Sequence, residues 1–193
     1  MNRWVPITLG LLYMVASGSC RKEQQLESLH ELTLNEVTGN PFSLASLKQH
    51  RGTVFLFLQP ECPFCVTYAR TFRQTDSLLR QYDISLIGVV AGTHFPVEQI
   101  QEYRSKHRLN FPFLLDPEFK LTRLLNATIT PQVFLLDQQG NRLYHGMLDN
   151  WGYEIGKVRA RATEFYLLDA VKAFVNNQPQ PRDSTRAIGC YIQ

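Results

Sequence analysis

The stretch FLFLQPECPFCVTYARTF, residues 55–72, joins a hydrophobic run to two closely spaced cysteines. The run belongs to GTVFLFLQP, residues 52–60, and a continuous apolar segment of this length is typical of a central parallel strand covered on both faces. From residue 63 to about residue 82, apolar side chains recur at steps near 3.6, which predicts a helix. Cys62 and Cys65 therefore lie where a buried strand ends and a helix begins.

The rest of the chain alternates predicted strands and helices. This order predicts an open α/β sheet with helices on both faces, and a closing hairpin makes the sheet mixed. Functional residues of such sheets gather at the carboxyl ends of strands, and Cys62 follows one such end. Strands are expected at 32–37 (as an edge strand), 83–92, 110–117, 132–137 and 142–146, and helices at 43–50, 96–108, 118–126 and 163–177.

The first twenty residues differ from the rest. Arg3 precedes an apolar stretch over residues 4–16, small residues occupy 17–19, and Cys20 follows. The stretch is too short to span about 30 Å of hydrocarbon as a helix, but it suits a signal peptide. Cys20 after small residues resembles a bacterial lipoprotein processing site, which implies a lipid on Cys20 and attachment to a membrane. Ordinary secretory cleavage and a retained anchor are the alternatives, and all three predict export to an oxidising compartment.

The composition is that of one globular domain with a short extension at each end. The chain has 193 residues, 44% hydrophobic and 19% charged, with a net charge of +3. A charge this small, without a basic stripe, argues against a nucleic-acid partner. We expect a signal peptide at 1–20, a polar tether at 21–30, the domain at 31–178, and a tail carrying Cys190 at 179–193.

The C-x-x-C spacing at a helix start suits thiol chemistry. Unpaired amides and the helix dipole stabilise a thiolate there. The first sulfur is expected to meet solvent, and the second lies one turn inward, within reach of a disulfide. Such a pair attacks a substrate disulfide and releases the product when the second cysteine attacks the first. Structural zinc is the alternative, but it needs a second pair of ligands, and the histidines are scattered over positions 30, 50, 94, 107 and 145, so no metal site is predicted.

Thr130-Pro131 directly precedes the predicted strand at 132–137. A proline leading into a strand is a candidate for a cis peptide bond, and a trans proline opening an edge strand is the alternative. In the cis case, the backbone of Thr130 can bind a substrate beside the sulfurs.

These features together resemble the thioredoxin superfamily, and more closely the exported redoxin or TlpA-like thiol–disulfide oxidoreductases of bacteria. The resemblance covers residues 29 to about 177. It implies a thioredoxin-like fold with a central mixed sheet and no cofactor. It also implies Cys62 as nucleophile, Cys65 as resolving thiol, a Cys62–Cys65 disulfide, and cis-Pro131 facing them.

Two positions depart from the thioredoxin pattern. Leu56 stands where many thioredoxins have a buried acid that relays protons, and Glu61 stands where an aromatic residue often precedes the first cysteine. Glu61 either assists proton transfer or raises the pKa of Cys62 through like charge. The direction of electron flow stays open.

Two further segments have two interpretations each. Cys190, in a tail expected to be flexible, is either a third redox cysteine or a spare thiol packed against the domain. The segment at 149–161 carries side chains able to bind a ligand, but a solvated loop with Trp151 anchored in the core is the plainer interpretation. We expect this loop at a sheet edge rather than over Cys62.

The leading hypothesis is a membrane-tethered thiol–disulfide oxidoreductase on the periplasmic or cell-surface side. Its predicted partners are exported proteins with thiols or disulfides, an upstream thiol donor, and the membrane through the lipid anchor. A peroxiredoxin-like peroxidase is the second hypothesis, although its P-x-x-x-T-x-x-C segment is missing, with Gln59 at the threonine position before Cys62. A Sco-like copper chaperone is the third, with His94 or His145 as a possible nitrogen ligand.

Overall fold

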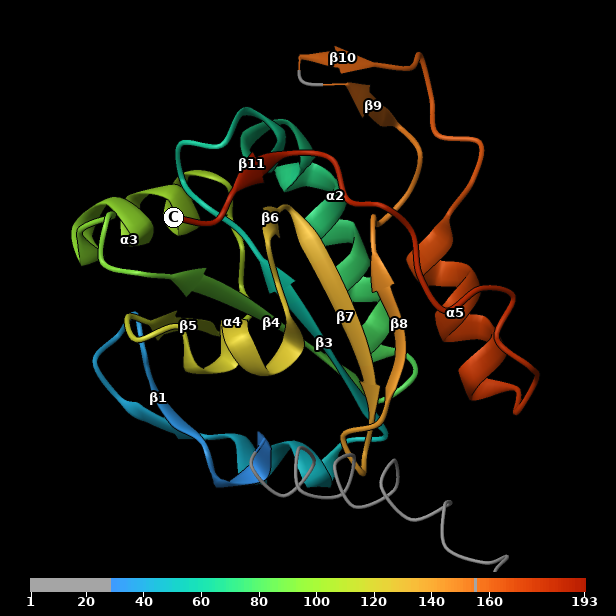
Figure 1. The fold of residues 1–193 in the computed structure, drawn as a ribbon, viewed down its shortest axis with the longest axis horizontal. Coiled ribbons are helices and arrows are strands. Elements are labelled where there is room, and N and C mark those ends of the chain that lie inside the picture. The colour runs from blue at the N-terminus through green and yellow to red at the C-terminus, as the bar shows by residue number, and fades with distance from the viewer. Residues whose placement is uncertain (1–28, 155) are drawn as a thin grey trace, which may run out of the picture.

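The computed structural model describes residues 29–154 and 156–193, which form a mixed sheet covered by helices (Figure 1). The main sheet has seven strands in the order β2-β1-β5-β4-β3-β7-β8. Strands β3, β4 and β5 run parallel, whereas β1, β7 and β8 are antiparallel to their neighbours, as expected for a thioredoxin-like sheet. The strands are β1 (Thr33–Glu36), β2 (Pro41–Ser43), β3 (Gly52–Phe57), β4 (Ile84–Ala91), β5 (Phe113–Asp116), β7 (Gln132–Asp137) and β8 (Arg142–Gly146).

The predicted strand at 32–37 corresponds to β1, but β1 is not an edge strand. Strand β2 pairs with it on the outside, and β5 pairs with it on the inside. Gly39, Asn40 and Pro41 are residue types typical of a turn, and they give no indication of the short strand that follows. The edge prediction was therefore wrong, because three residues beginning with a proline give no periodic signal.

Helices cover both faces of the sheet, as predicted. One hydrophobic cluster contains residues of α2, α3 and α5, and a second contains residues of η1 and α4. All residues of β3 are buried; Val54 and Leu56 belong to the first cluster, and Phe55 and Phe57 to the second. Burial on both faces explains the continuous apolar run. The helices are η1 (Leu44–Gln49, a 3-10 helix), α2 (Pro63–Arg80), α3 (Val97–Lys106), α4 (Lys120–Leu125) and α5 (Tyr166–Val175).

Two small sheets were not predicted. Strand β9 (Gly152–Glu154) pairs with β10 (Lys157–Val158), and β6 (Ile129–Thr130) pairs with β11 (Cys190–Tyr191). In Figure 1 the last residues of the chain run across the molecule to β6. The tail was expected to be flexible, but its end is antiparallel to β6. Among the described residues, β6 has no other partner strand for its backbone groups.

The predicted signal peptide, Cys20 and most of the tether lie outside the described residues. Within residues 29–154 and 156–193, no helix has the length and hydrophobicity needed to cross a membrane. Whether Cys20 carries a lipid stays a prediction.

Because the side chains of β3 are buried on both faces of the sheet, their truncation should lower the stability of the protein. Phe55 is fully buried, so Phe55→Ala should lower the free energy of unfolding by about 3–5 kcal/mol. Phe165 is 46% exposed, so the matched change Phe165→Ala should cost less than about half as much. Urea unfolding followed by circular dichroism measures both, and equal losses for the two variants would contradict the assignment of β3 to the core.

Candidate active site

Cys62 directly precedes the first residue of α2. It is the N-cap residue, with φ −69° and ψ 118°, and Pro63 stands in the first helical turn. No side chain caps the helix, so its first amides are free to face the Cys62 sulfur. A proline in this turn removes no needed amide hydrogen. The helix start therefore favours a negative charge at Cys62.

Cys65 lies one turn further along α2 and is fully buried. Its sulfur accepts a hydrogen bond from the backbone amide of Gln59 at 3.5 Å, and its thiol is hydrogen-bonded to Cys62. Both cysteines are free thiols in this structure. The two sulfurs are thus close together, and the Cys62–Cys65 disulfide stays a prediction.

The Thr130–Pro131 peptide bond is cis and faces Cys62. When protonated, the Cys62 thiol donates a hydrogen bond to the Thr130 carbonyl oxygen, which lies 3.2 Å from the sulfur. Strand pairing explains this proximity, because β7 is antiparallel to β3 and Gln132 lies opposite Phe57. The residues before β7 therefore lie beside the residues that follow β3.

Cys190 also reaches this site. It pairs with Thr130 in the β6–β11 ladder, and the Thr130 hydroxyl donates a hydrogen bond to the Cys190 carbonyl oxygen at 3.4 Å. The Cys190 thiol is hydrogen-bonded to Cys62. Three sulfurs from two distant parts of the chain therefore form one cluster.

The three thiols differ in pKa. Hydrogen bonds from the Cys65 thiol, together with those from Cys190 and nearby backbone amides, lower the pKa of Cys62 to about 5 against the opposing effect of burial. Burial, followed by the charge and hydrogen bond of Cys62, raises the pKa of Cys65 well above its usual value. The same causes raise the pKa of Cys190 to about 12. At neutral pH, Cys62 is the thiolate and the other two are thiols that donate to it.

Cys62 does not meet solvent as the sequence suggested. Its exposed fraction is 2%, because Cys190 and Ile188 of the tail pack against the hydrophobic cluster that contains it. Ile188 also lines a small cavity together with Pro131 and Phe64. The prediction of an exposed nucleophile was wrong because it placed the tail away from the domain.

Glu61 lies beside the site but points outward. It is exposed, and its carboxylate accepts a hydrogen bond from the Gln99 side chain at 2.7 Å. Leu56 is fully buried in the core. Among the described residues, neither Cys62 nor Cys65 has a carboxylate partner. The Tyr103 hydroxyl instead donates to the Cys65 carbonyl oxygen at 2.8 Å.

Gln59 was not predicted to belong to the oxidoreductase site. Gln59 is 7% exposed, its amide binds the Cys65 sulfur, and its side-chain oxygen accepts a hydrogen bond from the Thr130 hydroxyl at 3.2 Å. It therefore connects the cysteine segment to the cis-proline segment. A polar residue at the end of a fully apolar strand was the available signal.

The segment around Trp151 packs near the site rather than away from it. The Tyr68 hydroxyl donates to the Asp149 carboxylate at 2.6 Å and accepts from the Gly152 amide at 2.8 Å. The Trp151 and Tyr68 rings meet edge to face, with centroids 5.1 Å apart. A Cβ on Gly152 would lie 2.4 Å from the Phe64 ring, so any larger residue at this position would require the ring to move. The segment follows β8, the edge strand of the sheet, and Trp151 packs against the core as expected, while Gly152 approaches Phe64 in the first turn of α2.

The histidines proposed for a copper site have other neighbours. The His94 ring meets Phe95 edge to face, and the His145 ring stacks on Phe134. Within the described residues, no group of three or more His, Cys, Asp or Glu side chains is arranged to hold a metal ion. The arrangement gives no support to a copper chaperone.

The sheet, the paired cysteines and the facing cis-proline define a thioredoxin-like redoxin. The family model described as AhpC/TSA matches residues 27–143, so the chain belongs to the AhpC/TSA family. The match includes Cys62, Cys65 and Pro131 and ends before the tail. Membership places the protein among redox enzymes, without deciding between disulfide exchange and peroxide reduction.

Individual relatives agree with this assignment. A "thioredoxin-like protein" of Haemophilus influenzae is 27% identical over 142 residues, which cover 72% of this chain and 80% of that protein. A hypothetical protein of Sinorhizobium meliloti has a TM-score of 0.76 at 22% identity, over 85% of this chain and 91% of that one. A secreted disulfide oxidoreductase of Mycobacterium tuberculosis has a TM-score of 0.55 at 21% identity, over 80% and 98%. The two structures establish the fold alone.

The low pKa of Cys62 predicts its pH profile. The rate of Cys62 alkylation by iodoacetamide should rise with pH to a plateau, with its midpoint near pH 5, because the thiolate is the reactive form. Cys65→Ala removes the largest stabilising hydrogen bond and should move the midpoint upward. Mass spectrometry of the Cys62 peptide follows the reaction. A midpoint above about 8 in the unmodified chain, as for a free cysteine, would show that the thiolate is not stabilised.

Proposed function

We propose that this protein is a thiol–disulfide oxidoreductase that exchanges disulfides with exported proteins through Cys62 and Cys65. The observation that supports it most directly is the juxtaposition of a low-pKa Cys62, a buried Cys65 thiol and the cis-Pro131 segment. In such a pair, the thiolate can attack a substrate disulfide. The second thiol can then attack the mixed disulfide and release the substrate.

The exchange has two steps. The Cys62 thiolate attacks one sulfur of a substrate disulfide, a mixed disulfide forms, and the electron pair leaves on the other substrate sulfur. Cys65 then loses its proton to that leaving thiolate or to water and attacks the Cys62 sulfur. The second substrate thiolate departs, and the protein holds a Cys62–Cys65 disulfide. An upstream thiol donor reduces this disulfide and closes the cycle.

The high pKa of Cys65 has a role in this sequence. While Cys62 is a thiolate, its charge helps to keep Cys65 protonated. Once Cys62 enters a mixed disulfide, that charge disappears and Cys65 loses its proton more easily. The resolving step is thus favoured after substrate has bound.

The backbone of Thr130 is the proposed contact for substrate. Strand β6 lies directly before cis-Pro131, and the Thr130 carbonyl is 3.2 Å from the Cys62 sulfur. An extended substrate segment that pairs with β6 would present its cysteine to Cys62.

The exchange is tested with insulin as a disulfide substrate. The reduced protein should reduce insulin disulfides in the presence of dithiothreitol, and Cys62→Ser should abolish the reaction because the attacking sulfur is lost. A variant with both Cys65→Ser and Cys190→Ser should instead accumulate a mixed disulfide when dithiothreitol is omitted, visible by non-reducing electrophoresis. Cys20→Ser is the matched control and should leave the rate unchanged. Full activity of the Cys62→Ser variant would exclude this function.

Peroxide reduction is the second candidate, because the family match is to AhpC/TSA proteins. The same variants measure it when hydrogen peroxide replaces insulin. We expect slow consumption, since Gln59 occupies the position where peroxiredoxins have threonine. Consumption of peroxide much faster than reduction of insulin would reverse the ranking of the two functions.

We further propose that the protein is exported and held on a membrane by a lipid on Cys20. The apolar stretch at 4–16 and the small residues before Cys20 support the proposal. In bacterial cells that express the full chain, labelled fatty acid should be incorporated into the protein, and Cys20→Ser should prevent incorporation. Equal labelling of both proteins would contradict attachment at Cys20.

A further inference from the structure

The C-terminal tail is attached to the domain at two places. The first attachment is at the end of β8, where the Thr185 amide donates to the His145 carbonyl at 3.0 Å and the Met147 amide donates to the Thr185 hydroxyl at 2.8 Å. A Cβ on Gly146 would lie 2.3 Å from Thr185, so the two segments are in direct backbone contact. This attachment holds the tail before it reaches the site.

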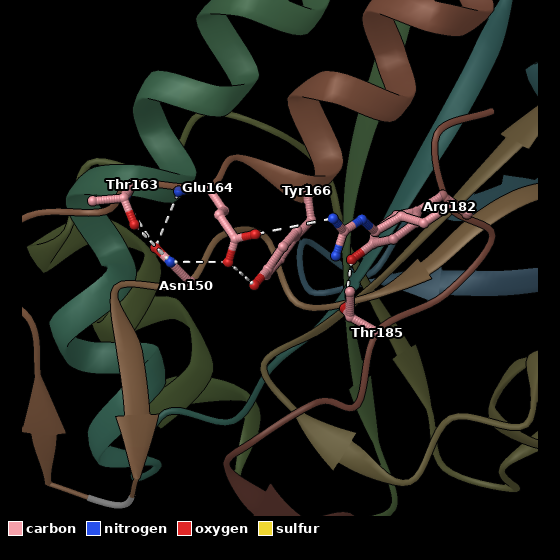
Figure 2. A network of polar contacts seen from close by, with 7 residues as sticks. Asn150, Thr163, Glu164, Tyr166, Arg182 and Thr185 are labelled. Atoms are coloured by element: carbon pink, nitrogen blue, oxygen red, sulfur yellow. Dashed lines mark hydrogen bonds and ion pairs between the residues drawn. The ribbon is translucent and has the colours of Figure 1, made fainter. Parts of the chain in front are cut away.

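A polar network strengthens the first attachment (Figure 2). The Asn150 side chain donates to Glu164 at 3.1 Å, and the Tyr166 hydroxyl donates to the same carboxylate at 2.6 Å. Arg182 lies 4.0 Å from Glu164, with its guanidinium over the Tyr166 ring. Figure 2 shows these residues in a row with Thr185 beside its end, where the Thr185 hydroxyl is hydrogen-bonded to Tyr144 at 2.6 Å. These contacts hold the tail at Arg182 and Thr185. The residues after Thr185 contact the domain at a second place, described next.

The second attachment is at the active site. Cys190 lies opposite Thr130, Tyr191 lies opposite Ile129, and the Ile192 amide donates to the Thr128 carbonyl at 3.0 Å. The tail therefore runs beside β6 as an added antiparallel strand.

Gly189 shows how closely the tail approaches. A Cβ at this position would lie 1.9 Å from the Thr130 carbonyl oxygen and 2.7 Å from its carbon. These are backbone atoms, which cannot rotate away as a flexible side chain would. The docked tail consequently requires glycine directly before Cys190.

The docked tail occupies the position assigned to substrate. It pairs with Thr130, it places a cysteine against Cys62, and Cys62 is left 2% exposed. Tyr191, by contrast, is 73% exposed, so the strand is not held by burial of its large side chain. An extended segment with a cysteine at the nucleophile has the form of a bound substrate.

We propose that residues 188–193 are an internal substrate of Cys62, with Cys190 as a third redox-active thiol, and that this segment must leave β6 before a protein disulfide can reach Cys62. The inference rests on the proposed function, which supplies the Cys62–Cys65 disulfide. The Cys190 thiolate attacks the Cys62 sulfur of that disulfide. The Cys62–Cys190 bond forms, the Cys62–Cys65 bond breaks, and the electron pair and the proton released by Cys190 pass to the Cys65 sulfur.

The electrostatics permit this step once the protein has reduced a substrate and holds the Cys62–Cys65 disulfide. Burial raises the pKa of Cys190 first, and the hydrogen bond and charge of the Cys62 thiolate raise it further. The second cause disappears when Cys62 is in a disulfide, so Cys190 becomes a better nucleophile only in the oxidised protein. In the reduced protein, Cys190 instead stabilises the Cys62 thiolate as a donor.

The test uses full-length Cys65→Ser protein treated with oxidised glutathione. Cys62 displaces one glutathione and becomes glutathionylated; if Cys190 then attacks, the second glutathione leaves and a Cys62–Cys190 disulfide remains. We expect this disulfide in acid-quenched, alkylated samples analysed by peptide mass spectrometry. Adding Gly189→Ala should leave glutathione on Cys62, whereas adding Arg186→Ala, an exposed tail position, should not. Glutathione retained on Cys62 in the Cys65→Ser protein, with Cys190 free, would overturn the proposal, and Cys65→Ala repeats the test if the serine variant folds poorly.

A second measurement tests displacement of the tail in a chain with all its cysteines. Gly189→Ala should increase the rate of Cys62 alkylation at pH 7 by about tenfold or more, because docking no longer covers the sulfur. The Arg186→Ala variant should react at the original rate. An unchanged rate in Gly189→Ala would overturn the tail as a cover of Cys62. Insulin reduction is not needed for either readout, so loss of the proposed function and loss of this inference are distinguishable.

Discussion

The chemistry of this protein depends on the hydrogen bonds received by one sulfur atom. Cys62 is nearly fully buried, and burial alone would keep it protonated. The Cys65 thiol, the Cys190 thiol and backbone amides outweigh that effect, so its pKa falls to about 5. Their arrangement depends on the end of β3, since α2 begins there and β7 begins beside it. The paired strands of the sheet thus set the geometry of the redox site.

The site carries no carboxylate partner for its cysteines among the described residues. Leu56 is part of the core, and Glu61 is bound to Gln99 at the surface. Proton movement during the proposed exchange then relies on the thiols themselves, on the departing substrate thiolate and on water. The negative charge is shared among the three cysteine sulfurs, and no buried carboxylate of the described residues takes up the proton. This arrangement makes the protonation of Cys65 and Cys190 respond directly to whether Cys62 is charged.

The C-terminal tail adds a segment to the family fold that covers Cys62. The family match ends at residue 143, but the active site of this chain is completed by residues near 190. A nucleophile covered by its own chain is protected from unspecific reaction, and access depends on the free energy of a local opening. Because the first attachment lies at residues 182–185, such an opening needs to release only the residues after it.

The sequence by itself determined the order of strands and helices and the position of Cys62 at a helix start. These follow from local information: a run buried on both faces, a 3.6-residue period and a proline after the first cysteine. It also pointed to Pro131 as the residue facing the cysteines, through resemblance rather than through spacing. It did not predict the short pairs β6–β11 and β9–β10, since two or three residues carry no readable period.

The tertiary structure alone decided what surrounds the sulfur. Gln59, Thr130 and Cys190 are far apart in the chain and meet only because β7 runs back along β3 and the tail returns to β6. The burial of Cys62, its low pKa and the function proposed for Cys190 all depend on this meeting. Local patterns carry no information about which distant backbone will satisfy an unpaired strand, so a tail that reads as a polar extension became part of the active site.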